Sequence, residues 1–337
     1  MNDRPMCLYS AVSDPALFER VGFYRDDLAA LATRSRDVRP INRLIDIWRL
    51  KPSVLLGYFY SKACLAAILA RLVGARVILT GGADQISPAL KSGLRLAAHR
   101  AVAFLCLCFA HRVVVSCDDD YQEFRRIACG FERLLGKISR APHVVRPGVG
   151  GQGLNRQVDG HFHAFTICWL GSVANAKRKG VDRAINLVAA LRGIGVDATL
   201  DVAGTTGMGL GYLERLASDS GVGSYVRFCG AISEDEKNRR FADGAVYLQL
   251  SRHEGFGVAA AEAFLSGMVV VHTNKGGLRD VIGPAGLVVD VEELLSGGGD
   301  SLRQFYGSYL SFSVNSDFLR AEARKYSIES RAQSLLG

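Results

Sequence analysis

The stretch between Ser251 and Asp290 constrains the fold more than any other, because a glycine turn, a helix and an apolar strand follow one another in it without a gap. The turn, Glu254-Gly255-Phe256-Gly257, leads into helix-forming residues 258–266, and an apolar run from Met268 to Val271 follows. Glycines in such a turn let the backbone approach a ligand, and the N–H groups of the next helical turn favour a negatively charged one. The stretch therefore predicts an α/β fold with an anion-binding turn.

Apolar runs alternate with helical stretches along the rest of the chain, on both sides of a break at residues 148–163 that is rich in Gly, Gln and Asn. Strands that alternate with helices form parallel sheets covered on both faces. We therefore predict an α/β chain of two doubly wound, Rossmann-like domains facing each other across a cleft, the first at residues 1–155 and the second at residues 156–314. The predicted strands are residues 6–12, 52–58, 75–79, 112–116 and 143–146 in the first domain, and residues 165–170, 199–203, 226–228, 246–250 and 268–271 in the second.

Charge and cysteine content narrow the class of protein. The net charge is +8, but residues 1–155 hold 22 Lys/Arg against 13 Asp/Glu, whereas residues 156–337 hold 19 against 20. The eight cysteines show no zinc-ligand spacing, so we expect free thiols in a reducing cytoplasm. The N-terminus lacks the features of a signal peptide, and the longest apolar run, Ala101 to Ala110, is too short to span a bilayer. A cytoplasmic protein is therefore expected.

Residues 251–290 resemble the signature of the retaining glycosyltransferases of family four, which have the GT-B fold. The signature comprises a serine, the E-G-F-G turn, a second glutamate eight positions after the first, and a later glycine pair. Here these are Ser251, Glu254 to Gly257, Glu262 and Gly276-Gly277. The resemblance implies a retaining glycosyltransferase of the hexosyltransferase type, acting in polysaccharide or glycolipid biosynthesis. Such an enzyme moves a sugar from a nucleotide diphosphate sugar to a hydroxyl of a glycan or lipid-linked glycan. It also implies that a C-terminal helix, residues 315–337, crosses back toward the N-terminal domain.

The same resemblance implies which residues act on the donor. Glu254 and Lys179 are the expected catalytic residues: Lys179 would bind the diphosphate, where charge develops as the glycosidic bond breaks, and Glu254 would contact the donor sugar. Glu262 is expected to bind the ribose diol, because an ionised carboxylate accepts two hydroxyl donors. The further expected donor-binding residues are Gly171, Ser172, Arg178, Gly204, Cys229, Ala231, Gly255, Phe256 and Gly257.

Among the departures from the family pattern, two concern the expected donor site. Ser172 stands where an arginine is usual, and we hypothesise that Lys177 or Arg178, in the loop 171–180, supplies the missing charge. The alternative is that this loop is merely basic and solvated. In the first domain no histidine stands in the region after residues 75–79, where Asp84 is expected either to contact the sugar or to cap a helix.

No cofactor and no metal are expected. No Asp-x-Asp pair lies near Glu254 or Glu262, so cations and a helix N-terminus would stabilise the phosphates. Asp118-Asp119-Asp120 is predicted to cap a helix, with metal binding as the weaker alternative.

Other functions stay open on the residues alone. A non-catalytic sugar-nucleotide binding protein of the same fold and a sugar-nucleotide epimerase are the alternatives. A dehydrogenase is disfavoured because no G-x-G-x-x-G follows the first predicted strand. The residues do not distinguish a uridine from a guanosine donor.

The basic N-terminal half predicts a partner of opposite charge. Six cations, Arg34, Arg36, Arg39, Arg43, Arg49 and Lys51, lie beside apolar residues that include Trp48. Basic and aromatic residues together are typical of a surface that contacts anionic lipid. We therefore expect a peripheral position on the inner face of the cytoplasmic membrane and no nucleic-acid partner. A solvated basic surface, or adventitious binding of RNA-like contaminants, is the alternative.

Overall fold

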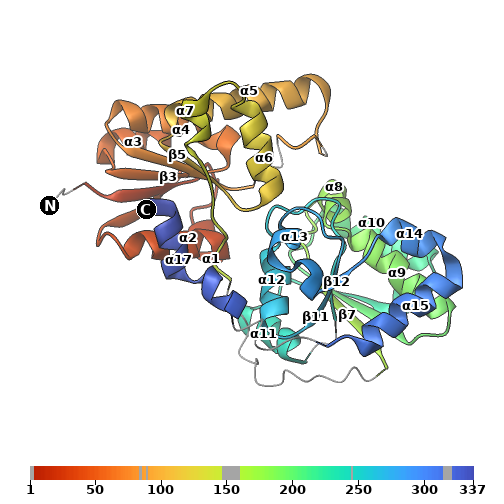
Figure 1. Ribbon diagram of the computed structural model, residues 1–337. Coiled ribbons are helices and arrows are strands. Elements are labelled where there is room, and N and C mark those ends of the chain that lie inside the picture. Colours follow the sequence, from red (N-terminus) through yellow and green to blue (C-terminus); the bar gives the residue numbers. More distant parts are fainter. Residues whose placement is uncertain (1–3, 83–85, 89, 146–159, 244–245, 314–320) are drawn as a thin grey trace. The chain divides into compact units, whose positions relative to one another are not determined.

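The computed structural model describes residues 4–82, 86–88, 90–145, 160–243, 246–313 and 321–337. The chain divides into two compact units (Figure 1). The first comprises residues 1–144 together with 324–337, and the second comprises residues 145–323.

The first unit is built on a parallel sheet of six strands in the order β2-β1-β3-β4-β5-β6. Its third strand is buried along its whole length, which agrees with helices covering both faces of the sheet. The strands are β1 (Met6–Tyr9), β2 (Val38–Ile41), β3 (Val54–Tyr58), β4 (Arg76–Thr80), β5 (Arg112–Val115) and β6 (Ile138–Arg140).

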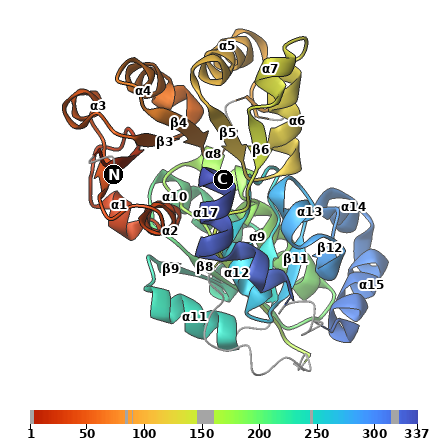
Figure 2. The same cartoon turned by 60° about the vertical axis from the view of Figure 1, so that its left-hand side comes forward.

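Two sets of helices cover the two faces of this sheet (Figures 1 and 2). One face packs against apolar residues of α3 (Leu44–Leu50), α4 (Tyr60–Leu72), α5 (Gly93–Phe109), α6 (Asp118–Ile127) and α7 (Glu132–Leu135). The other face packs against α1 (Leu17–Arg20), α2 (Gly22–Ala32) and the last helix of the chain, α17 (Ile328–Leu336). The C-terminal segment is therefore part of the first unit's core.

Local details of the first unit differ from the sequence prediction. Residues 38–41 and 44–50, for which the pattern predicted no element, form β2 and α3, and α3, with seven residues, is too short to show a clear helical period. The strand predicted at residues 143–146 is wrong for its described part, residues 143–145, because the edge strand ends at Arg140 and Pro142 has no N–H to continue the ladder. Helices α1 and α2 are separated at Val21, whose backbone is extended.

The second unit has a parallel sheet in the order β12-β11-β10-β7-β8-β9. In this sheet β8 and β9 lie on one side of β7, whereas β10, β11 and β12 lie on its other side. The direction of strand addition therefore reverses between β7 and β10. The strands are β7 (Phe162–Ile167), β8 (Ala198–Ala203), β9 (Val226–Gly230), β10 (Val246–Gln249), β11 (Val269–His272) and β12 (Leu287–Val288).

Helices also cover both faces of the second sheet. The larger core lies under α9 (Val181–Gly193), α10 (Met208–Asp219), α14 (Val291–Ser296) and α15 (Gly298–Ser311). Figure 1 shows α11 (Glu234–Asp243), α12 (Val258–Leu265) and α13 (Gly277–Val281) on the other side of the sheet. Gly297 separates α14 from α15, which begins at Gly298.

The predicted α/β class and its two doubly wound parallel sheets are confirmed. Within the described residues, no helix is both long enough and apolar enough to cross a membrane.

Candidate active site

The expected site residues of the second unit follow the carboxyl ends of its strands. Gly171 and Ser172 come after β7, Gly204 after β8, and Glu254 after β10. In an open parallel sheet, ligands bind beyond the carboxyl ends where the strand order reverses, and here that point lies between β7 and β10. The segments that follow these two strands therefore define the candidate site.

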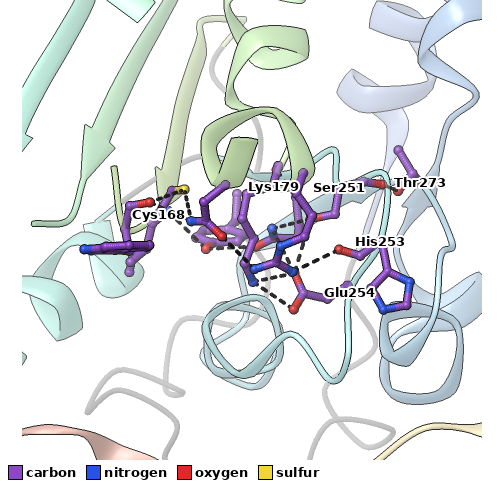
Figure 3. A network of polar contacts seen from close by, with 12 residues as sticks. Cys168, Lys179, Ser251, His253, Glu254 and Thr273 are labelled. Atoms are coloured by element: carbon purple, nitrogen blue, oxygen red, sulfur yellow. Dashed lines mark hydrogen bonds and ion pairs between the residues drawn. The ribbon is translucent and has the colours of Figure 1, made fainter. Parts of the chain in front are cut away.

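Lys179 and Glu254 form a close ion pair at this point, pointing toward one another (Figure 3). The Lys179 ammonium donates to both carboxylate oxygens of Glu254, with Nζ 2.8 Å from Oε1 and 2.6 Å from Oε2. The Glu254 side chain is 6% exposed and the Lys179 side chain 23% exposed. Ser251 Oγ, at 3.2 Å, and Gln249 Nε2, at 3.4 Å, also donate to Glu254 Oε2. The carboxylate thus accepts hydrogen bonds from three side chains, while the Lys179 side chain is partly exposed.

Glycines hold the backbone around this pair. Gly180 has a φ of +74°, and a Cβ there would lie 1.9 Å from the carbonyl oxygen of Leu250. This close approach sets Lys179 against the end of β10. The Gly276-Gly277 pair performs a similar role on the other side: a Cβ at Gly276 would lie 1.9 Å from the Glu254 carbonyl oxygen, which accepts the Gly277 N–H at 2.9 Å. Both contacts require glycine.

The segment 171–180 is not the loop that the sequence predicted. Residues 173–178 form the short helix α8 (Val173–Arg178), and Ser172 caps it, with its Oγ accepting the Asn175 N–H at 3.2 Å. Ser172 therefore has a structural partner where an arginine is usual in the family. Arg178 donates to Asn175 Oδ1 at 2.8 Å and to the His253 carbonyl at 3.4 Å, which places its guanidinium beside the segment that carries Glu254.

Of the two cations proposed to replace an arginine, Arg178 lies nearer the pair. The Lys177 ammonium instead lies over the ring of Tyr212, 5.0 Å from its centroid. The Lys177 side chain is thus directed to α10, whereas Arg178 lies beside the segment that carries Glu254.

The glycine turn leads into α12 as expected. Gly257 adopts a left-handed conformation, with φ +82°, and no side chain caps the helix. Phe256 is buried, whereas a Cβ at Gly255 would meet no atom within 4 Å. The turn thus anchors itself through Phe256 and leaves open space at Gly255, next to the N-terminus of α12.

Glu262 has a partner that sequence reasoning missed. The Lys237 ammonium on α11 lies 2.9 Å from Glu262 Oε2 and 2.8 Å from a Glu234 oxygen. The Glu262 side chain is 10% exposed and the Lys237 side chain 12% exposed. Burial by itself would lower the pKa of Lys237, but the two carboxylates outweigh it and raise the pKa, so the ammonium stays charged. No spacing pattern links residues 25 positions apart on different helices, and only the fold reveals the pair.

The remaining donor-binding candidates meet at the ends of β8 and β9. The Gly204 N–H donates to the Gly230 carbonyl at 2.8 Å, between the expected residues Cys229 and Ala231. Gly204 has a φ of +138°, and a Cβ there would lie 1.9 Å from the Cys168 carbonyl oxygen. Cys229 is half-buried and Ala231 exposed, so both are accessible from this edge of the sheet.

Asp84 lies outside the described residues. Asp118, Asp119 and Asp120 occupy the first turn of α6, where Asp118 pairs with Arg140 at 3.1 Å. In the part of the chain that the structure describes, no group of three or more His, Cys, Asp or Glu residues is placed to hold a metal ion.

Comparisons with known proteins match the second unit in sequence. Residues 164–297 match the family "Glycosyl transferases group 1". A D-inositol 3-phosphate glycosyltransferase of Nocardioides sp. is 37% identical over 103 residues, which cover 27% of this chain and 22% of the relative. A GDP-mannose-dependent alpha-(1-6)-phosphatidylinositol monomannoside mannosyltransferase of Mycobacterium tuberculosis is 32% identical over 122 residues, covering 34% of this chain and 31% of the relative. The matched region thus spans less than a third of each of these curated relatives.

A solved structure matches nearly the whole chain in fold. HepE of Anabaena, determined in complex with UDP and glucose, superposes with a TM-score of 0.71 over 98% of this chain and 97% of its own, at 13% identity. The resemblance to glycosyltransferases of the GT-B fold, inferred from the residues around Glu254, is thereby confirmed.

Proposed function

We propose that this chain, whose residues 164–297 match the glycosyl transferases group 1 family, moves a sugar from a nucleotide diphosphate sugar to a hydroxyl of an acceptor, with retention of configuration at the anomeric carbon. The acceptor in this proposal is a glycan or lipid-linked glycan in polysaccharide or glycolipid biosynthesis. The observation that carries the proposal is the Lys179–Glu254 pair at the point where the strand order reverses.

Lys179 suits the diphosphate in this reaction. The leaving nucleoside diphosphate gains negative charge as the glycosidic bond breaks, and preorganised positive groups stabilise that charge. An ammonium has three N–H donors. Among the described residues Glu254 is the one acceptor for the Lys179 ammonium, and it accepts two hydrogen bonds. The third proton and the exposed part of the side chain are available to a phosphate oxygen. Arg178 and the uncapped N-terminus of α12 add positive potential nearby.

The two glutamates divide the donor between them. Glu254, restrained by Ser251 and Gln249, would accept hydroxyls of the donor sugar close to the reacting carbon. Glu262, paired with Lys237, would accept both hydroxyls of the ribose. We propose that no metal ion takes part, because Lys179, Arg178 and the α12 turn supply the positive charge that the diphosphate needs.

The two curated relatives motivate the acceptor class through their names. One name refers to D-inositol 3-phosphate and the other to phosphatidylinositol monomannoside, the latter with GDP-mannose as donor. HepE, in contrast, was solved with UDP and glucose bound. Uridine and guanosine donors are therefore both to be tested.

A thermal-shift screen of the purified chain against UDP, GDP and their sugars tests donor binding first. A ligand present at about 100 times its dissociation constant raises the free energy of unfolding by about 2.7 kcal/mol, so a true donor gives a clear shift. Release of nucleoside diphosphate on adding glycan or glycolipid acceptors then tests transfer, and NMR of the product anomer tests retention. Binding of a donor without transfer to any acceptor would favour a non-catalytic binding protein.

Glu254→Gln and Glu262→Gln form a matched pair for this assay. Glu254→Gln is expected mainly to lower kcat, and Glu262→Gln mainly to raise the donor KM, because the ribose is remote from the reacting carbon. Swapped phenotypes would reverse the two assignments.

Activity in excess EDTA is expected to equal the activity without EDTA. Loss of activity that added magnesium restores would contradict metal independence.

A further inference from the structure

The outer surface of α3 and α4 in the first unit combines exposed apolar side chains with cations. We refer to this surface, defined by Arg43, Ile45, Trp48, Arg49, Lys51, Lys62, Leu65 and Leu72, as the α3–α4 face. The two helices pack against each other and lie on the same side of the first sheet (Figures 1 and 2).

Helix α3 divides its residues between the core and this face. Ile47 is fully buried, whereas Ile45 is 43% exposed and Trp48 57% exposed. Ile45, Trp48 and Arg49 stand at positions i, i+3 and i+4, so they share one side of the helix. A helix with apolar residues on its outer side as well as its inner side has a second apolar surface to bury.

Helix α4 extends the apolar surface. Leu65, which is 62% exposed, lies about one helical turn after the exposed Lys62. Leu72, which is 72% exposed, lies about two turns after Leu65. Single exposed apolar residues are ordinary on protein surfaces. Four large ones on two neighbouring helices, interspersed with cations, are typical of a surface that contacts a partner.

The excess positive charge of the N-terminal half lies in the part of the sequence that contains this face. Residues 38–112 hold 11 Lys/Arg and 2 Asp/Glu, while the rest of residues 1–155 hold 11 of each. Within the described chain, Arg43, Arg49 and Lys51 make no ion pair with a carboxylate. The charge is thus left for a partner rather than neutralised internally.

We propose that the α3–α4 face binds an anionic lipid bilayer. Trp48, Ile45, Leu65 and Leu72 enter the boundary between headgroups and acyl chains, and the arginines and lysines contact lipid phosphates. A bilayer satisfies both kinds of side chain, whereas the phosphate backbone of a nucleic acid leaves the leucines without a partner. The inference goes beyond the donor chemistry and places the chain at the inner face of the cytoplasmic membrane.

The chain contains two tryptophans, Trp48 and Trp169, which makes the insertion step directly observable. The Trp169→Phe variant reports on Trp48 alone, and Trp48→Phe on Trp169 alone; the two native side chains are similarly exposed, at 57% and 58%. With vesicles of equal parts phosphatidylglycerol and phosphatidylcholine at low salt, we expect the Trp48 emission to shift to the blue and to be quenched by lipids with brominated acyl chains. The Trp169 emission is expected to stay unchanged. An unchanged Trp48 emission would overturn the proposal.

Charge variants test the electrostatic part. Each cation near an anionic bilayer contributes about fivefold to binding, so Arg43→Gln with Arg49→Gln is expected to weaken cosedimentation with these vesicles about 25-fold. The matched control, Arg239→Gln with Arg303→Gln, removes two exposed arginines of the second unit, with side chains 71% and 66% exposed, and is expected to bind as the parent does. Thermal unfolding checks that both variants remain folded. Equal loss in the control, or binding to RNA in place of vesicles, would overturn the proposal.

Discussion

Each of the two units has a carboxylate–cation pair near the carboxyl ends of its strands, Asp27–Arg331 in the first and Lys179–Glu254 in the second, and these two pairs differ in how many of their hydrogen bonds the chain itself supplies. In the first unit, Asp27 and Arg331 are each 1% exposed, and Arg331 makes two bonds to Asp27, at 2.7 and 2.9 Å. Its other donors reach the carbonyls of Ala141 and Pro142 and the hydroxyl of Thr80. In the second unit, the Lys179 side chain is 23% exposed and has Glu254 as its one acceptor among the described residues.

This difference separates a structural pair from a pair that is open to a ligand. The buried guanidinium of Arg331 already makes all its hydrogen bonds, so it has no donor left for a substrate. It joins α17 to α2 and to the end of β4. Burial raises the pKa of Asp27, but the Arg331 charge and its bonds outweigh burial and hold that pKa below its usual value. An ammonium with a proton to spare and a partly exposed stem can instead add an anionic ligand without breaking its existing bonds.

The largest effect is expected from Arg331→Met. The change leaves the Asp27 carboxylate buried without its cation, which costs about 3–5 kcal/mol. Chemical denaturation followed by circular dichroism measures the loss. The double variant Asp27→Leu with Arg331→Met removes both charges and is expected to recover most of the stability, since well-packed apolar residues often replace a buried pair without loss. A single variant as stable as the parent would show that the pair is not structural.

Lys179→Ala is expected to act on the reaction rather than on folding. Removing one group that stabilises developing charge typically lowers kcat by about 10²–10³-fold. The unfolding temperature should change little, because Glu254 keeps two other donors, from Ser251 and Gln249. Lys177→Ala is the matched control, since its ammonium lies over Tyr212, and it should leave kcat nearly unchanged. If Lys179→Ala destabilised the fold as much as Arg331→Met, the contrast between the two pairs would fail.

A smaller effect is expected from Lys237→Met. Losing the bond that holds Glu262 costs about 1.5 kcal/mol, or tenfold in the dissociation constant of the donor nucleotide, because the carboxylate is then no longer positioned for the ribose hydroxyls. Turnover at saturating donor should persist. Calorimetric titration with the nucleoside diphosphate measures the change, and Arg239→Met on the same helix, with a side chain 71% exposed, serves as control. Tightened or unchanged affinity would show that Lys237 does not position Glu262 for the nucleotide.

The smallest effect concerns pH and the first pair. Burial and the nearby Arg331 charge lower the pKa of His143 to about 3, and its Nε2 lies 2.9 Å from Ser116 Oγ. As the pH falls, the unfolded chain therefore takes up a proton on His143 before the folded chain does. The contribution of the neutral histidine to stability is complete above its ordinary pKa of 6.5 and is lost progressively as the pH falls toward 3. His143→Gln should reduce the slope of unfolding free energy against pH by about one proton in that window. His161→Gln, which removes an imidazole that is 61% exposed, is the control.

The sequence by itself determined the fold class and the donor motif of this chain. Alternating apolar runs and helical stretches are local patterns, and they predicted two doubly wound sheets that the structure confirms. The spacing around Glu254, Glu262 and Gly276-Gly277 is also local, so it predicted the resemblance to the family, and the separate segment 171–180 predicted Lys179 as a reacting residue. Their chemical roles stay predictions until they are assayed.

Only the tertiary structure decided which side chains meet and which stay exposed. Asp27 and Arg331 are 304 positions apart, and Lys237 reaches Glu262 across 25 positions on a different helix. The sequence placed cations beside Trp48, but only packing shows that Ile47 is buried while Trp48 is exposed. Pairing and exposure depend on distances between distant segments, and no pattern of neighbouring residues contains that information.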